Sequence, residues 1–143
     1  MNRDNLALLA EYLLTIDHEK FNMSLYSMDD YEFYTVTDAL EQNFCGTAAC
    51  MVGHATAIFP LIEEDIIEKT SSIDGEVYYE VDFLKYSIRV FGIEYGSKWE
   101  YIFGSEWSNS IPEAIERIVH VLLGGVIPEW PYIESNIDIM ENR

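Results

Sequence analysis

Positively charged residues are scarce in this chain of 143 residues. Only eight Lys and Arg stand against 26 Asp and Glu, which gives a formal net charge of −18 at pH 7. No Lys or Arg lies between Lys20 and Lys69. Such a negative field repels the phosphates of nucleic acids and of anionic membranes. The composition therefore excludes a typical nucleic-acid or membrane-surface binder. Three explanations for the negative charge are left: a basic partner, a bound cation, or simple solubility.

Cysteine and long apolar runs are lacking as well. The two cysteines, Cys45 and Cys50, are too few for the disulfide framework of a small secreted protein. The N-terminal segment lacks the pattern of a secretory signal, because Glu11 interrupts its apolar run. No apolar run reaches the roughly 20 residues that a membrane-spanning helix needs. These absences predict a cytoplasmic protein.

Material for a core is present. Hydrophobic residues make up 49% of the chain and aromatic residues 14%, which excludes a disordered chain because such chains cannot bury enough apolar surface. We find no internal repeat, low-complexity tract or linker, so we expect one domain over 1–143. The periodicities predict a mainly α fold of the α+β class, with about five helices around a central helix and one small β-hairpin.

Capping residues delimit the predicted helices. The first helix is expected over Asn5–Ile16 with Asp4 as its N-cap, and the central helix over 47–59 with Thr47 as its N-cap. Three more helices each have a polar residue at the start and glycine at the end: Asp82 to Gly92, Ser97 to Gly104, and Ser110 to Gly124.

A hairpin is predicted between the central helix and the helix that follows Asp82. Asp74-Gly75 favours a two-residue turn, because glycine accepts positive φ, and residues 76–81 are rich in strand formers. Residues 20–44 show no clear periodicity and are expected to be irregular, with one short strand at most.

The segment from Cys45 to Ala55 has the most distinctive sequence, and four explanations remain open for it. Cys45, Cys50 and His54 could ligate a metal, although a structural zinc site takes four ligands. A cysteine near a helix N-terminus could be a nucleophile with His54 as base. The helix start at Gly46 and Thr47 could bind an anion. The preferred explanation is structural, with buried cysteines and a capping threonine. We therefore expect no metal and no cofactor.

Two further groups of residues are candidates for binding. The aromatic residues Trp99, Tyr101 and Trp107 could stack a nucleobase while Gly46 and Thr47 hold a phosphate, although core packing is the simpler explanation. Carboxylates concentrate where cations are missing and could form one negative face. The candidate protein-binding residues among them are Asp29, Asp30, Glu32, Glu63, Glu64, Asp65 and Glu68.

The pattern C-G-T-x-x-C-x-x-G-x-A, which runs from Cys45 to Ala55, resembles a family of small uncharacterised proteins of phages and bacteria. The similarity covers most of the chain. It extends to Leu6 to Leu13, Phe21-Asn22-Met23, Val90-Phe91-Gly92, Tyr101-Ile102-Phe103-Gly104 with Trp107, and Ala114-Ile115-Glu116-Arg117-Ile118. The resemblance implies no established activity and no catalytic residue. It also implies that an aromatic residue often stands at the position of His54, which weakens a role for His54 as metal ligand or base.

These observations predict an acidic, non-enzymatic binding protein, a phage-type inhibitor that docks on a basic surface of a host or phage protein. Steering by charge would make its association fast and sensitive to salt. The alternative is a small-ligand protein that binds or sequesters a nucleotide signal. A third hypothesis is an enzyme that uses Cys45 or Cys50.

Overall fold

The computed structural model describes residues 1–22, 32–41, 50–104 and 110–128. Within them the predicted mainly α fold of the α+β class is confirmed. The α-helices are α1 (Arg3–Leu13), α2 (Val36–Glu41), α3 (Met51–Ala55), α4 (Phe83–Phe91), α5 (Ser97–Phe103) and α6 (Ile111–Leu122). The strands are β1 (Ile66–Thr70) and β2 (Val77–Val81), and the short 3-10 helices are η1 (His18–Lys20) and η2 (Glu63–Asp65).

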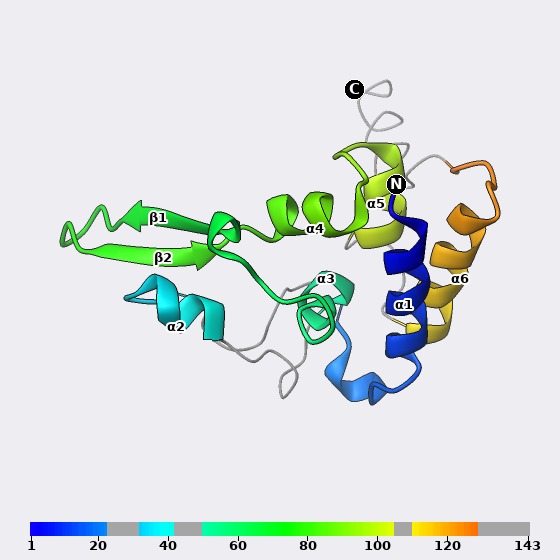
Figure 1. Cartoon of the computed structure of the whole chain (residues 1–143), viewed down its shortest axis with the longest axis horizontal. Helices are drawn as coiled ribbons and strands as arrows, with labels where there is room; N and C mark the ends of the chain where they lie inside the picture. The colour runs from blue at the N-terminus through cyan, green and yellow to red at the C-terminus, as the bar shows by residue number, and fades with distance from the viewer. Residues whose placement is uncertain (23–31, 42–49, 105–109, 129–143) are drawn as a thin grey trace, which may run out of the picture.

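The elements form two regions, which Figure 1 shows next to each other. Helices α1, α3, α4, α5 and α6 form a helical body, in which α1 packs against α6 and α5 packs beside them. The hairpin of β1 and β2 projects from this body, and α2 lies along the side of β2. We call residues 32–41 and 63–82 together the arm. Because β2 leads directly into α4, the arm is continuous with the body at that point.

Apolar residues at helical spacing build the core of the body. Leu6, Leu9 and Leu13 of α1 are completely buried, as the predicted face requires. Ile118 and Val121 of α6 belong to the same core cluster. The central segment is also buried as expected, since all five residues of α3 are inaccessible to solvent.

Two of the predicted helices begin at the residues that the sequence indicates. The Asp82 carboxylate accepts a hydrogen bond from the amide of Lys85 at 3.0 Å and caps α4. The Ser110 hydroxyl accepts one from the amide of Glu113 at 3.3 Å and caps α6. Gly92 ends α4 with φ +65°, as predicted for a residue in the left-handed conformation.

The starts of α1 and α5 differ from the prediction. Asn2 caps α1 by accepting from the amide of Asn5 at 3.0 Å, whereas Asp4 lies in the first turn. In the first turn, the negative charge of Asp4 still interacts favourably with the positive end of the helix dipole. Gly96 precedes α5, so Ser97 is the first helical residue and makes no cap.

The helix predicted over 47–59 is much shorter in the structure. Cys50 has extended backbone (φ −75°, ψ 178°) and is the N-cap, so α3 begins at Met51. After Ala55 the amides of Thr56, Ala57 and Ile58 bond three residues back, which tightens the chain before Pro60. Thr47, the predicted cap, lies outside the described residues.

The hairpin is confirmed, but its turn is longer than predicted. β1 and β2 pair antiparallel with Ile66 opposite Val81 and Thr70 opposite Val77, so six residues (71–76) connect the strands instead of two. Gly75 has φ +72°, as a glycine in a turn requires.

The segment predicted to be irregular contains regular structure. Phe33 and Tyr79 exchange two backbone hydrogen bonds, of 2.8 and 2.6 Å, on the edge of β2 away from β1. Helix α2 follows, and the Thr35 hydroxyl accepts from the amide of Asp38 at 3.0 Å at its start. Helix α2 is only six residues long, which is too short for a clear 3.6-residue period.

Candidate functional site

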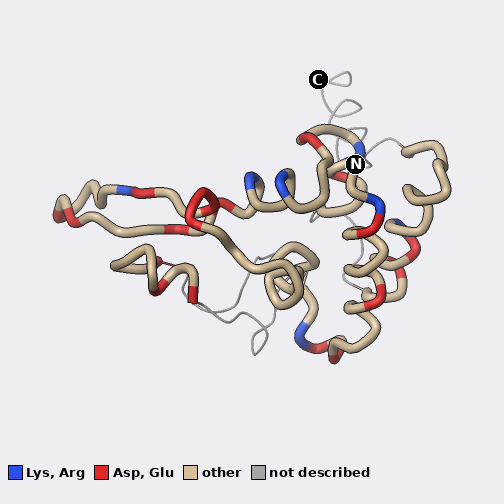
Figure 2. Tube along the Cα trace, in the orientation of Figure 1, with Lys and Arg blue, Asp and Glu red and all other residues tan. Residues whose placement is uncertain are grey.

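The arm carries the densest negative charge in the described part of the chain. Its residues include eleven Asp and Glu and a single cation, Lys69. The Lys69 ammonium lies 3.2 Å from the Glu80 carboxylate across the hairpin, and this hydrogen-bonded ion pair raises the pKa of Lys69. Figure 2 shows the red segments along the hairpin and α2, whereas blue segments lie mainly on the body. The arm is therefore an acidic projection.

Asp65 stands apart from the other candidate acids, because it is completely buried. Arg89 of α4 donates to both of its carboxylate oxygens, at 2.8 Å from Nη2 and 3.2 Å from Nε. The amide of Ile62 donates to Asp65 as well, at 2.9 Å. The prediction that Asp65 contacts a partner is thus wrong: its charge is used to fix the arm to the body.

The same joint contains a buried tyrosine. Tyr86 of α4 donates from its hydroxyl to the carbonyl of Phe59 at 2.5 Å, and Arg89 lies over its ring at 5.5 Å. Burial raises the pKa of Tyr86, so its hydroxyl remains a donor at neutral pH. Together with the Asp65–Arg89 pair, this hydrogen bond holds η2 and the segment after α3 against α4.

The remaining candidate acids do not form one cluster. Glu63 and Glu64 are exposed on η2, at the base of the arm, and Glu68 is exposed on β1. Glu32 lies near the other end of the arm. Asp29 and Asp30 lie outside the described residues.

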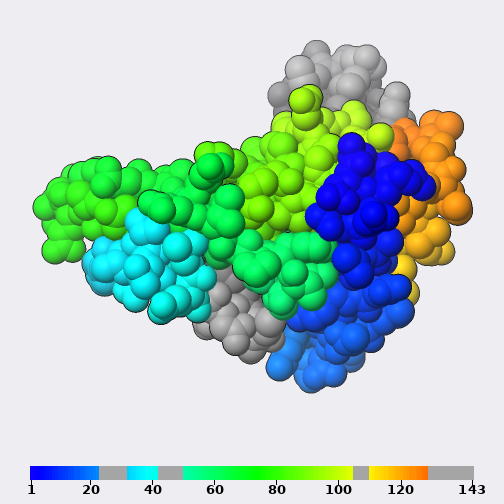
Figure 3. All heavy atoms as spheres, in the orientation of Figure 1, coloured from blue at the N-terminus to red at the C-terminus, as the bar shows by residue number. Residues whose placement is uncertain are grey.

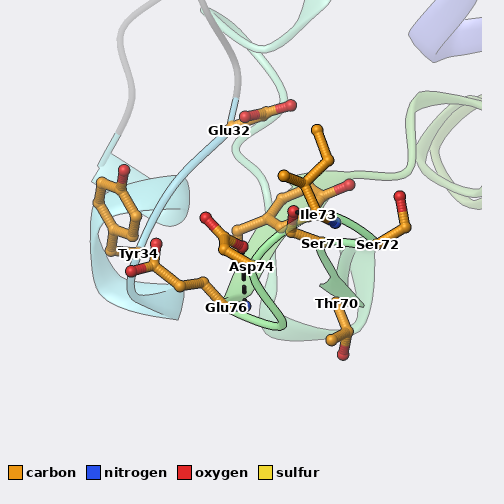
Figure 4. A pocket seen from close by; sticks show the side chains of 9 residues that line it. Glu32, Tyr34, Thr70, Ser71, Ser72, Ile73, Asp74 and Glu76 are labelled. Carbon is orange, nitrogen blue, oxygen red and sulfur yellow. Dashed lines mark hydrogen bonds between the residues drawn. The ribbon is translucent and has the colours of Figure 1, made fainter.

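A cavity of about 500 Å³ opens between the hairpin loop and the segment that precedes α2. Figure 4 shows its walls: Tyr34 faces the loop from one side, with the side chains of Asp74 and Glu76 between them. The described residues that line this loop groove are Glu32, Tyr34, Thr70, Ser71, Ser72, Ile73, Asp74, Glu76 and Tyr78. Three of these residues are carboxylates and none carries a positive charge.

Backbone hydrogen bonds shape the loop groove. The Asp74 carboxylate accepts from the amide of Glu76 at 3.0 Å, and this bond, together with one from Ser71, lowers the pKa of Asp74. The amide of Gly75 donates to the carbonyl of Ser71 at 3.0 Å. The loop thus presents an ionised carboxylate at neutral pH.

Apolar side chains are exposed beside these charges. Tyr34 is 76% exposed and Ile73 is 96% exposed, although both are large and hydrophobic. Both residues line the loop groove, and apolar surface exposed in a groove is a common feature of binding sites. Carboxylates beside an aromatic ring can bind a guanidinium or ammonium group, through charge-assisted hydrogen bonds and stacking on the ring.

Sequence reasoning missed most of this groove. Of its lining residues only Glu32 was a candidate, and Tyr34, Ile73, Asp74 and Glu76 were not. The Asp74-Gly75 turn was available as a signal, since a predicted hairpin loop places its acids at an exposed tip. The sequence did not indicate that residues 32–34 would lie opposite that loop.

The residues of the central segment around α3 are buried, as residues with a structural role are. Cys50 is 3% exposed, and burial raises the pKa of its thiol to about 11, so the thiol is protonated at neutral pH. The hypothesis of an activated nucleophile is therefore wrong for Cys50. Cys45, Gly46 and Thr47 lie outside the described residues.

His54 is buried and neutral. Its Nε2 lies 2.6 Å from the carbonyl oxygen of Lys20, and because a carbonyl only accepts, Nε2 carries the proton. Nδ1 is buried with no hydrogen-bond partner among the described residues. Burial lowers the pKa of His54. The described ranges contain no group of three or more His, Cys, Asp or Glu placed to hold a metal ion.

The aromatic residues proposed to stack a nucleobase are not an open platform. Trp99 is 6% exposed, and its indole donates to the hydroxyl of Ser87 at 2.8 Å inside the body. Tyr101 is half-buried, with its ring 5.6 Å from that of His120. Trp107 lies outside the described residues. The prediction of a stacking role is thus wrong for Trp99, which is a core residue.

No protein-family model, curated protein or solved structure matches this chain. The resemblance to small phage and bacterial proteins therefore stays a prediction. Within the ranges that the structure covers, every helix is too short or too polar to cross a lipid bilayer.

Proposed function

We propose that this chain is an acidic, non-enzymatic binding protein whose arm docks on a basic surface of another protein. The loop groove is the observation that carries the proposal: an exposed cavity with three carboxylates, a tyrosine ring and an exposed isoleucine. The expected class is a phage-type inhibitor that blocks a host or phage factor, in line with the resemblance described above.

An arginine or lysine of the partner is the natural occupant of the loop groove. Its charge would lie beside Asp74 and Glu76, and its side chain would pack on the ring of Tyr34, which is available because it is exposed. Charged groups contribute more when an adjoining apolar surface excludes water, and hot spots of interfaces commonly contain tyrosine and arginine. Ile73 supplies such an apolar surface at the rim.

The charge of the arm would also speed the encounter with a basic partner. Eight of the eleven carboxylates of the arm are exposed, and they attract a positive surface over about 8 to 10 Å at physiological salt, the length over which ions screen a field. Binding should therefore weaken as salt is raised, mainly through slower association.

Affinity capture from the native host tests this proposal. The bait is the wild-type chain, compared with Glu32→Gln/Glu76→Gln, which neutralises two carboxylates of the loop groove. The control is Glu11→Gln/Glu116→Gln, which removes the same charge from exposed residues of α1 and α6. We expect one protein to be captured by the wild type and the control, and to be lost with the groove variant and at high salt. Capture that is insensitive to salt, or equal for both double variants, would refute the proposal.

A further inference from the structure

The backbone hydrogen bonds of the hairpin fix which groups of β1 point outward. The amide of Ser71 donates to the carbonyl of Glu76 at 2.8 Å, and the amide of Asp82 donates to the carbonyl of Asp65 at 2.7 Å. In an antiparallel ladder, hydrogen-bonded pairs alternate with pairs that are not bonded. Between these two bonded pairs, the outward positions on β1 are Ile66, Glu68 and Thr70.

The hydrogen bonds on the opposite edge of the hairpin agree with this assignment of the outward positions. Tyr79 exchanges both of its backbone hydrogen bonds with Phe33, so its amide and carbonyl point away from β1. Glu68 stands opposite Tyr79 in the register, and its own amide and carbonyl must therefore point away from β2. Within the described ranges, these two groups of Glu68 have no hydrogen-bond partner.

No described segment pairs with the outer edge of β1. Helix α2 contacts both strands, whereas the backbone pairing of Phe33 with Tyr79 protects the edge of β2 alone. Figure 3 shows the arm as a projection whose upper outline, along β1, is free of other elements. Glu68, Lys69 and Thr70 are exposed. An edge strand of this kind is a template on which another extended segment can form hydrogen bonds.

We propose that β1 binds an extended, basic segment of the partner as an added strand, with main-chain hydrogen bonds to Glu68 and Thr70. The inference rests on the proposed function, because it names the form in which the same partner meets the arm. Strand addition obtains affinity from main-chain hydrogen bonds and selectivity from alternate side chains. The partner residues opposite Glu68 and near the loop groove would be basic.

A second copy of this chain is a poor occupant of the same edge. Antiparallel pairing of two β1 strands about their centres would place Glu68 opposite Glu68 of the other copy, and like charges opposite each other destabilise a sheet. Each copy also has a formal charge of −18, and the arm holds eleven of the carboxylates. Charge complementarity thus favours a basic segment over self-association.

Synthetic peptides test the strand addition directly. The probe is a peptide of alternating lysine and valine, about ten residues long, which is the upper range of strand lengths. Its control has proline in place of valine, which keeps the charge but disfavours pairing in a sheet. We expect the first peptide to protect the amides of Glu68 and Thr70 from hydrogen exchange, and the second to leave them exposed.

Two proline variants complete the experiment. Glu68→Pro removes an outward amide without breaking the ladder to β2, and Glu68→Gln is the matched control for the lost charge. We expect Glu68→Pro to weaken binding of the lysine–valine peptide about tenfold, the equivalent of one lost hydrogen bond, whereas Glu68→Gln changes it less. Thr70→Pro repeats the test at the second outward amide if Glu68→Pro fails to fold.

The outcomes separate this inference from the proposed function. If both peptides bind equally, lose affinity with the groove variant and are indifferent to Glu68→Pro, the arm binds basic groups through the loop groove and strand addition is wrong. Failure of the lysine–valine peptide to bind at all also overturns strand addition, while the capture experiment decides separately whether a basic protein docks on the arm.

Discussion

The arm and the body of this molecule distribute charge and apolar surface in opposite ways. Among the buried hydrophobic residues that the structure describes, only Phe33, Ala39 and Val81 belong to the arm. Both regions expose single apolar residues, such as Tyr34 and Ile73 in the arm and Leu14, Leu123 and Val126 outside it, but the carboxylates gather on the arm. The buried apolar surface that stabilises the fold therefore lies mainly in the body, whereas most carboxylates of the arm are exposed and available for contact with another molecule.

The comparison shows why the arm needs the body. A two-stranded hairpin is at best marginally stable alone in water. Here α2 packs along one side of it, and Asp65 and Arg89 tie its base to α4. Repulsion among the carboxylates of the arm opposes the folding of the arm. The body offsets this repulsion, because it supplies most of the buried apolar surface that stabilises the fold.

The largest contrast is expected between a core residue of the body and an exposed apolar residue of the arm. Leu9→Ala in α1 should lower the free energy of unfolding by about 3 kcal/mol, because Leu9 is completely buried in the body and the change leaves a cavity. Ile73→Ala in the arm should change it by less than about 0.5 kcal/mol, since Ile73 is exposed. Urea denaturation measures both values. Similar losses for the two variants would contradict the division into a stabilising body and a binding arm.

The joint between the regions should give the next largest effect. Asp65→Ala removes the buried carboxylate and leaves Arg89 without its ion-pair partner. The loss of a fully buried partner costs about 3 to 5 kcal/mol, and we expect about 2 kcal/mol here because a third of the Arg89 side chain reaches solvent.

Glu64→Ala is the control for the joint, since Glu64 is the exposed neighbour of Asp65 on the same 3-10 helix. It should leave the stability nearly unchanged in the same urea titration. Equal effects at both positions would mean that the ion pair does not join the arm to the body.

The elements that were predicted correctly are those with strong local signals in the sequence. Helices α4 and α6 have a side-chain cap at the first residue and a strong apolar period, so Asp82, Gly92 and Ser110 were identified correctly. Helices α2 and α3 are six and five residues long. Such short helices depend on packing against distant residues, which no local pattern reveals.

The candidate site was harder to predict, for the same reason. Asp65 looked like one of several surface acids, but its partner Arg89 is 24 residues further along the chain. The loop groove forms because Phe33 pairs with Tyr79, which brings Tyr34 to the hairpin loop. The sequence predicted the acidic surface and the hairpin separately, and it could not predict that a cavity lies where they meet.

A smaller effect on stability is expected when pH is varied. It arises from His54, which is buried in the body. Burial lowers its pKa below the ordinary value of 6.5, so the unfolded chain binds a proton more readily than the folded chain. The stability associated with neutral His54 is therefore complete above about pH 6.5 and falls as pH is lowered through that value, by at most about 1.4 kcal/mol per pH unit. Unfolding titrations between pH 7.5 and pH 5 should reveal this slope.

His54→Gln is the variant that isolates this effect, since an amide can still donate to the carbonyl of Lys20 but does not titrate. The variant should have a flatter dependence of stability on pH than the wild type, whatever its absolute stability. Parallel pH profiles for the two proteins would show that the acid sensitivity arises elsewhere.

The smallest difference between the two regions is expected for two glycines with positive φ, one in each region. Gly75 in the arm has φ +72° and no atom near the position of an added Cβ, whereas a Cβ on Gly92 would lie 3.2 Å from the amide nitrogen of Asn2. Both alanine variants incur the cost of the left-handed conformation, about 1 to 2 kcal/mol. Gly92→Ala should exceed Gly75→Ala, because it must also displace the N-terminus.

The hydrogen bond from the amide of Asn2 to the carbonyl of Phe91, at 2.7 Å, reports that displacement. Hydrogen exchange at Asn2 should therefore accelerate in Gly92→Ala and stay unchanged in Gly75→Ala, while the two differ in free energy of unfolding by several tenths of a kcal/mol. If Gly75→Ala proves the more damaging, close packing around the N-terminus matters less than the geometry of the hairpin loop. The body would then tolerate adjustments that the arm does not, which is the reverse of what their buried surfaces imply.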